Sequence, residues 1–275
     1  MEILPGAPPL PGMGGAVRRL TANGFLLWQL SLREFTGASK GSFLGGLWSW
    51  LYPLMLLVVY SLVFSTVFKM RWGLDVPEGF ASFALVLFCG FIPYNFLATV
   101  VQRSATVIVN NSGLVAKVVM PLELLPASLL VAAAIQLAIT TLILLAAELL
   151  LLRTFSWGML YALPVLLALV LLSAGFGLLI AVLGAFVRDT ANLVGVVLQM
   201  LFFLTPITYP MSAVPERLQR YFMLNPLTPI VIDWRGALMS GVPPHWDWVA
   251  IEIAAGAVLT VIGYRLLLRS QRAFT

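Results

Sequence analysis

The sequence predicts an all-α integral membrane protein in which six transmembrane helices make up most of the chain. Residues 47–68 contain no charged side chain, and five further stretches of the 275-residue chain are similarly apolar. A helix rises about 1.5 Å per residue, so about 20 apolar residues are needed to cross a hydrocarbon core about 30 Å thick. Because 61% of the residues are hydrophobic and 10% are charged, no sizeable soluble domain remains.

Two segments precede the first predicted span. Residues 1–17 are rich in proline and glycine and lack the pattern of a cleaved signal peptide, so we expect a disordered cytoplasmic tail. Residues 18–40 show helical periodicity interrupted by charges, which predicts an amphipathic helix lying in the membrane interface. A simple anchor and a role in gating both fit this helix. Its apolar face carries Phe25, Trp28, Leu32 and Phe35.

The six spans are predicted from hydropathy and length. The third and fourth are long enough to tilt in the bilayer. With both termini in the cytoplasm, ten of the 16 Lys and Arg residues lie inside and six lie outside, in the direction of the positive-inside rule. The net charge of +5 therefore reflects topology and not nucleic-acid binding. The spans are expected at residues 47–68, 80–102, 124–152, 158–186, 191–209 and 247–268.

Aromatic residues recur at every fourth position of the first span and share one helix face. Core packing or an interfacial belt explains such a stripe, and a smooth surface for sugar rings is the alternative. The stripe comprises Trp48, Tyr52, Leu56, Tyr60, Phe64 and Phe68. Polar residues inside other spans either bond neighbouring helices or line a wet path, and bonding between helices is the favoured explanation. Examples are Asn95 with Thr99, and Gln199 with Thr205 and Thr208.

Two connecting segments carry more pattern than simple linkers. Residues 103–123 contain a short helical stretch that ends at Pro121, so this cytoplasmic segment is either a surface turn or a helix that docks into a partner. Residues 210–246 are apolar but broken by prolines and charges. Broken helices at membrane depth need protein or water around them, which favours an outer re-entrant helical pair over an interfacial hairpin.

The sequence does not favour an enzyme. It contains no phosphate-binding loop of the G-x-x-x-x-G-K-[ST] type, no paired carboxylates for acid–base chemistry, and no metal-binding spacing around its single cysteine, Cys89. The single histidine, His245, is more typical of a structural residue than of a ligand. Energy for uphill transport would have to come from another subunit.

Several short motifs occur at residues 32–35, 42–48, 114–121, 188–189, 205–210 and 224–226. In their sequence and order they resemble the permease subunits of bacterial polysaccharide ABC exporters. This type 2 ABC permease family serves O antigen, teichoic acid and capsule export. The chain departs from the family at Ala38 and Ser39, where Arg-Tyr is common, and Lys40 is adjacent.

The resemblance implies a channel-forming subunit of an ATP-driven exporter in the bacterial inner membrane. Two copies would form the pore, and two copies of a separate ABC ATPase would bind ATP and Mg, with no cofactor in this chain. The substrate would be a lipid-linked glycan, and periplasmic export components are further expected partners.

The resemblance also suggests roles for particular residues. Residues assigned to a substrate path are Arg33, Lys40, Trp48, Tyr52, Tyr60 and Phe64. Residues assigned to coupling with the ATPase are Asn111, Ser112, Leu114, Lys117 and Met120. Residues assigned to the outer re-entrant exit are Asn225, Pro226, Asp233 and Arg235. Alternatives are an exporter of a small amphiphile, a membrane enzyme acting on lipid-linked sugars, and a passive scaffold.

Overall fold

The computed structural model describes residues 13–37, 47–48, 51, 54–55, 58–59, 62–63, 80–113, 121–151 and 157–270, and the regular elements within them are helical. The chain folds into α1 (Met13–Ala22), α2 (Gly24–Gly37), α4 (Phe80–Asn110), α6 (Leu124–Leu151), η3 (Trp157–Tyr161), α7 (Ala162–Phe186), α8 (Thr190–Leu204), η4 (Met211–Ala213), α9 (Glu216–Phe222), α10 (Leu227–Arg235), η5 (Gly236–Ser240) and α11 (Trp246–Ser270).

Four helices in the described part of the chain are long and apolar enough to cross a membrane: α4, α6, α7 with the preceding η3, and α11. They correspond to the second, third, fourth and sixth predicted spans. The helix α8 has 15 residues, about 22 Å of rise, and is therefore shorter than a hydrocarbon core. Most of the first predicted span lies outside the described residues. The all-helical membrane architecture is confirmed, and the count of six spans stays a prediction.

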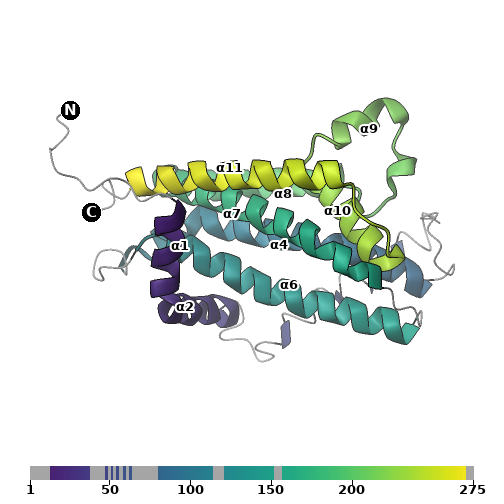
Figure 1. Ribbon diagram of the computed structural model, residues 1–275, viewed down its shortest axis with the longest axis horizontal. Coiled ribbons are helices and arrows are strands. Elements are labelled where there is room, and N and C mark those ends of the chain that lie inside the picture. Colours follow the sequence, from purple (N-terminus) through teal and green to yellow (C-terminus); the bar gives the residue numbers. More distant parts are fainter. Residues whose placement is uncertain are drawn as a thin grey trace.

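The four long helices run beside one another along the length of the molecule (Figure 1). The short helices α1 and α2 lie at the end where α6 begins and α11 ends, and α9 and α10 lie at the opposite end (Figure 1). The helix α7 packs against both α4 and α11. It is thus the centre of the bundle.

Glycines bring α7 close to its neighbours. A Cβ atom at Gly184 would overlap the carbonyl oxygen of Ala105 on α4, and one at Gly256 of α11 would lie 2.7 Å from the backbone nitrogen of Leu172. Within a membrane, helices associate largely through close packing of small residues, because lipid competes equally for apolar surface. These glycines therefore form the tight seams of the bundle.

The part of residues 18–40 that the structure describes belongs to two helices, α1 and α2, with a break at Asn23, and its place in the membrane interface stays a prediction. The Asn23 side chain donates a hydrogen bond to the carbonyl of Arg19 (2.8 Å), a local bond that competes with regular helix geometry. On α2, Leu30 is buried, while 80% of Phe25 is exposed. The helix therefore keeps a large apolar surface free of contact within the described part of the chain.

Candidate functional site

A groove with a volume of about 550 Å³ runs between α4 and α8. It mixes polar and apolar side chains, whereas the contacts between α4 and α7 are mainly apolar. Pockets of this size accept ligands, and a few placed polar groups set what they accept. The residues that line the groove include Phe91, Tyr94, Asn95, Thr99, Gln102, Arg103, Gln199 and Phe202.

One wall of the groove is a packed cluster of aromatic rings. The ring of Phe202 on α8 lies edge-on to those of Tyr94 and Phe91 on α4, with centroid distances of 5.1 Å and 6.1 Å. The Tyr94 hydroxyl donates to the carbonyl of Leu198 (2.9 Å), which ties the two helices together. Edge-to-face packing and this hydrogen bond hold the wall in one arrangement.

Amide and hydroxyl groups also line the groove and give part of its surface a polar character. Gln102 donates from Nε2 to the carbonyl of Ala191 (3.1 Å). Asn95, Thr99 and Gln199 have no side-chain hydrogen bond within the described part of the chain, although all three line the groove. Each offers donors and acceptors to a ligand. The groove can therefore bind a hydroxyl-rich molecule weakly at several points, without any group suited to catalysis.

One end of the groove is charged and joins it to the helix α2. Arg103 lines the groove and forms an ion pair with Glu34, whose backbone carbonyl also accepts from Arg103 (3.2 Å). Arg33 donates to the side-chain oxygen of Asn111 (2.7 Å) and to Glu34 (3.2 Å). Arg33 was assigned by sequence to a substrate path and Asn111 to coupling, and the structure brings the two into direct contact.

The residues assigned to an outer exit form a set of buried contacts. Arg235 is 6% exposed and donates to the carbonyls of Val86 on α4, Pro206 and Ile207, at 3.1–3.2 Å. Asp233 is also buried, and it accepts from the backbone nitrogen (3.1 Å) of His245 and pairs with its Nδ1 atom (2.6 Å). These contacts anchor α10 against α4 and against the start of α11.

Asn225 and Pro226 immediately precede α10. The side-chain oxygen of Asn225 accepts from the backbone nitrogen of Leu227 (3.0 Å), and its amide donates to the hydroxyl of Thr205 (2.8 Å). The asparagine therefore makes a local turn before α10 and links the start of that helix to the segment after α8. A role of these outer residues at an exit stays a prediction.

Several assigned residues lie outside the described part of the chain: Lys40, Tyr52, Tyr60, Phe64, Leu114, Lys117 and Met120. Trp48 is described and is 40% exposed, and Ser112 is exposed beyond the end of α4. Sequence reasoning missed the aromatic wall, because Phe91 and Tyr94 need Phe202 from a distant helix to form it. A usable signal was present, since Phe91, Asn95, Thr99 and Gln102 recur at helical spacing.

Comparison with known proteins identifies the transport class. Residues 26–238 match the family model of the ABC-2 type transporters. The protein belongs to this family. The chain is therefore a multi-pass membrane transport subunit, and the resemblance seen in its motifs is confirmed.

Individual relatives cover nearly the whole chain. An O-antigen export system permease protein RfbA of Klebsiella pneumoniae is 24% identical over 90% of this chain and 93% of its own. An RfbA of Myxococcus xanthus is 27% identical over 88% of this chain and 91% of its own. The polysialic acid transport protein KpsM of Escherichia coli is 27% identical over 83% of this chain and 84% of its own.

Proposed function

We propose that this chain is the permease subunit of an ATP-driven exporter that moves a lipid-linked polysaccharide across the bacterial inner membrane. The groove between α4 and α8 carries the proposal, because its aromatic wall and unpaired amides match the two faces of a sugar chain. Sugar rings place C–H groups against aromatic faces and hydroxyls against amides. Relatives named for O-antigen export and polysialic acid transport support the same substrate class.

The proposed machine contains two copies of this chain and two copies of an ABC ATPase, which binds ATP and Mg. In each copy six spans cross the membrane, with both termini in the cytoplasm. The substrate enters near Arg33 and Lys40, and the first-span residues Tyr52, Tyr60 and Phe64 add to the aromatic surface. The outer segment with α10 lies at the exit, and periplasmic components receive the product there.

Coupling follows from the contact between α2 and the end of α4. In this proposal the segment of Leu114, Lys117 and Met120 docks into the ATPase. A movement of that segment reaches α2 through the Arg33–Asn111 hydrogen bond and reaches the charged end of the groove through the Glu34–Arg103 ion pair. The same displacement can therefore widen the groove when ATP binds.

The test replaces polar groove residues by apolar ones of similar size, with Asn95→Leu and Gln199→Met as the variants. Neither side chain has a hydrogen bond to lose within the described part of the chain. We expect normal assembly with the ATPase and normal ATP hydrolysis, but at least a tenfold loss of cell-surface glycan, equivalent to about 1.4 kcal/mol. Export is measured by surface glycan labelling in a strain that depends on this gene.

A matched control is Asn192→Leu, which changes the same residue type on α8 at an exposed position outside the groove lining. Unchanged export in Asn95→Leu and Gln199→Met would contradict the groove as the glycan path. If the same cells export a small amphiphile, and neither variant changes that export, the alternative of a small-amphiphile exporter would be favoured. Failure to copurify with any ATPase would overturn the transport mechanism itself.

A further inference from the structure

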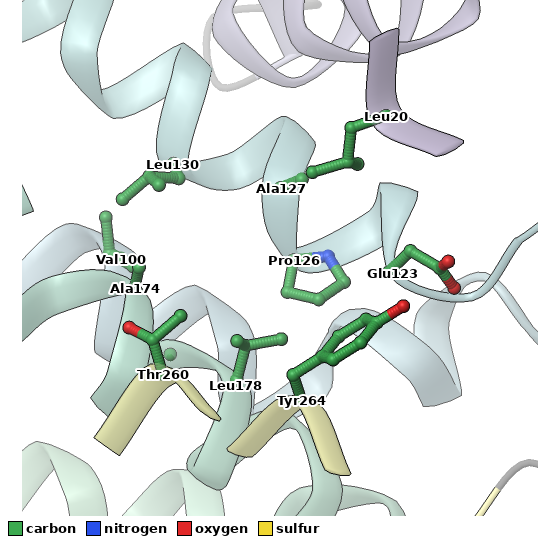
Figure 2. A pocket seen from close by; sticks show the side chains of 11 residues that line it. Leu20, Val100, Glu123, Pro126, Ala127, Leu130, Ala174, Leu178, Thr260 and Tyr264 are labelled. Carbon is green, nitrogen blue, oxygen red and sulfur yellow. The ribbon is translucent and has the colours of Figure 1, made fainter. Parts of the chain in front are cut away.

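A second cavity lies on the other side of α4 and has a different character. It has a volume of about 180 Å³ and is enclosed by α1, α4, α6, α7 and α11 at the end of the bundle where α6 begins. Its walls are almost wholly apolar, with Val100, Leu130, Ala174 and Leu178 around the interior (Figure 2). It shares no lining residue with the groove between α4 and α8.

Two polar side chains line one edge of this cavity. Glu123 is 3% exposed, and neither of its carboxylate oxygens has a hydrogen bond to the described residues. The Tyr264 hydroxyl is also buried and has no hydrogen-bond partner in the described part of the chain. Figure 2 shows both groups toward the same side of the cavity, with Leu130 and Val100 away from them. Buried polar atoms are mostly paired in native proteins, so these two adjacent groups offer hydrogen-bonding positions to a bound molecule.

A cation on α1 lies beside the Glu123 carboxylate. The Nη1 atom of Arg19 on α1 lies 3.6 Å from Oε1 of Glu123, which is an ion pair but too long for a hydrogen bond. The Arg19 side chain is 47% exposed. The next residue on α1, Leu20, lies over the apolar part of the cavity. A buried acceptor, a cation paired with it and an apolar space therefore adjoin one another.

We infer that this cavity binds one phospholipid with an amine headgroup, such as phosphatidylethanolamine. The primary ammonium donates to Glu123 and Tyr264, the phosphate pairs with Arg19, and part of an acyl chain fills the apolar interior. An apolar cavity of about 150 Å³ is large enough for benzene, so this one has room for a short stretch of hydrocarbon. The choline headgroup carries no N–H. Phosphatidylcholine is therefore a poorer partner for Glu123 and Tyr264, because it cannot donate a hydrogen bond to them.

A lipid bound at this position would connect several helices. Glu123 immediately precedes α6 and follows the segment assigned to coupling, while Arg19 belongs to α1. A lipid bound to both residues would join α1 to the start of α6 and to α11. The inference rests on membrane residence and not on the identity of the exported molecule.

The experiment is native mass spectrometry of the full-length chain with an equimolar mixture of dioleoyl phosphatidylethanolamine and dioleoyl phosphatidylcholine. We expect one retained lipid, with the ethanolamine form favoured about tenfold. In Glu123→Gln the preference should fall to near unity, because the charge that binds the ammonium is lost. In Ala174→Leu retention of either lipid at this stoichiometry should be lost, because the added side chain occupies the cavity.

The matched control is Ala255→Leu, the same change at an exposed position of α11, which should behave as the unaltered protein. Ala127→Leu, which also lines the cavity, is the second filling variant if Ala174→Leu does not elute as a folded species. Equal retention of the two lipids by the unaltered protein would overturn the inference. So would full retention in the filled variants, or displacement of the ethanolamine lipid by equimolar polyprenyl phosphate. Failure of glycan export in the tests above would leave these outcomes unaffected.

Discussion

The helix α4 is packed tightly on the side of α7 and loosely on the side of α8. Toward α7, Gly184 lies directly against the backbone of Ala105, and a Cβ added at Gly177 would lie only 3.0 Å from the Val100 side chain. Toward α8, Gly195 would place a Cβ 3.6 Å from Gln102, an ordinary contact. One face of the same helix is thus part of the core, and the other borders a groove.

The difference shows how one helix can serve both stability and transport. Small residues bring α7 close enough for dispersion contacts, which drive helix association in lipid. Amide and aromatic side chains keep α8 at a distance and leave polar groups unpaired. The packed face should therefore be sensitive to added volume, and the groove face should be sensitive in transport rather than in folding.

The largest expected effect is on the packed face. Gly184→Leu places a branched side chain where a Cβ already overlaps the Ala105 carbonyl, so α4 and α7 must separate. We expect no folded protein after detergent extraction, measured by fluorescence-detected size exclusion. Gly195→Ala on the groove face is the control and should elute normally. Equal yields for the two variants would show that the two faces do not differ in packing.

A smaller effect is expected where α10 is anchored to α4. Arg235→Leu leaves three carbonyls without their donor, and breaking a buried charged network typically costs about 3 kcal/mol. We expect a clear loss of thermal stability in detergent. Arg220→Leu on the exposed face of α9 should change stability by less than about 0.5 kcal/mol. Arg235→Leu with an unaltered melting temperature would contradict the anchoring role.

The contact between α2 and α4 should contribute less. The Arg33 side chain is 41% exposed, so its hydrogen bond to Asn111 is screened by solvent. A double-mutant cycle with Arg33→Ala and Asn111→Ala should give a coupling of about 0.5–1 kcal/mol in thermal denaturation. The exposed Arg188→Ala, paired with Asn111→Ala, should give none. A zero coupling for Arg33 would remove the link that the transport proposal uses.

The smallest stability effect is expected in the groove. Thr99→Val should change stability by less than about 0.5 kcal/mol, because its hydroxyl has no partner in the described part of the chain. Thr205→Val, at the end of α8, is the comparison, since that hydroxyl donates to the carbonyl of Leu201 (2.7 Å) and accepts from Asn225. It should cost about 1 kcal/mol in the same melting experiment. Equal costs would show that Thr99 is bonded after all.

The long helices were predictable, because hydropathy over about 20 residues is a local property. The predicted windows 124–152 and 247–268 correspond closely to α6 and α11. The predicted second span ends at residue 102, whereas the helix α4 continues to Asn110. In the structure Arg103 stays within the helix, since Glu34 of α2 supplies its counter-charge.

The site was only partly accessible from sequence. Asn95 and Thr99 were seen to share a face, but bonding between helices was the favoured explanation, and the structure shows them lining the groove. Whether such a face bonds a neighbouring helix or lines a groove depends on the helix opposite it, which the sequence of one helix does not reveal. The Phe202 ring belongs to a helix about one hundred residues later in the chain.

The sequence by itself determined that this is a helical membrane protein of the polysaccharide-exporter type, because composition, span length and short motifs are local signals. Only the tertiary structure decided which faces are packed and which border a groove. It also joined Arg33 to Asn111, 78 residues away, and placed Arg19 beside Glu123. Such pairings depend on how helices associate, and in lipid that association is set by close fit rather than by hydrophobicity.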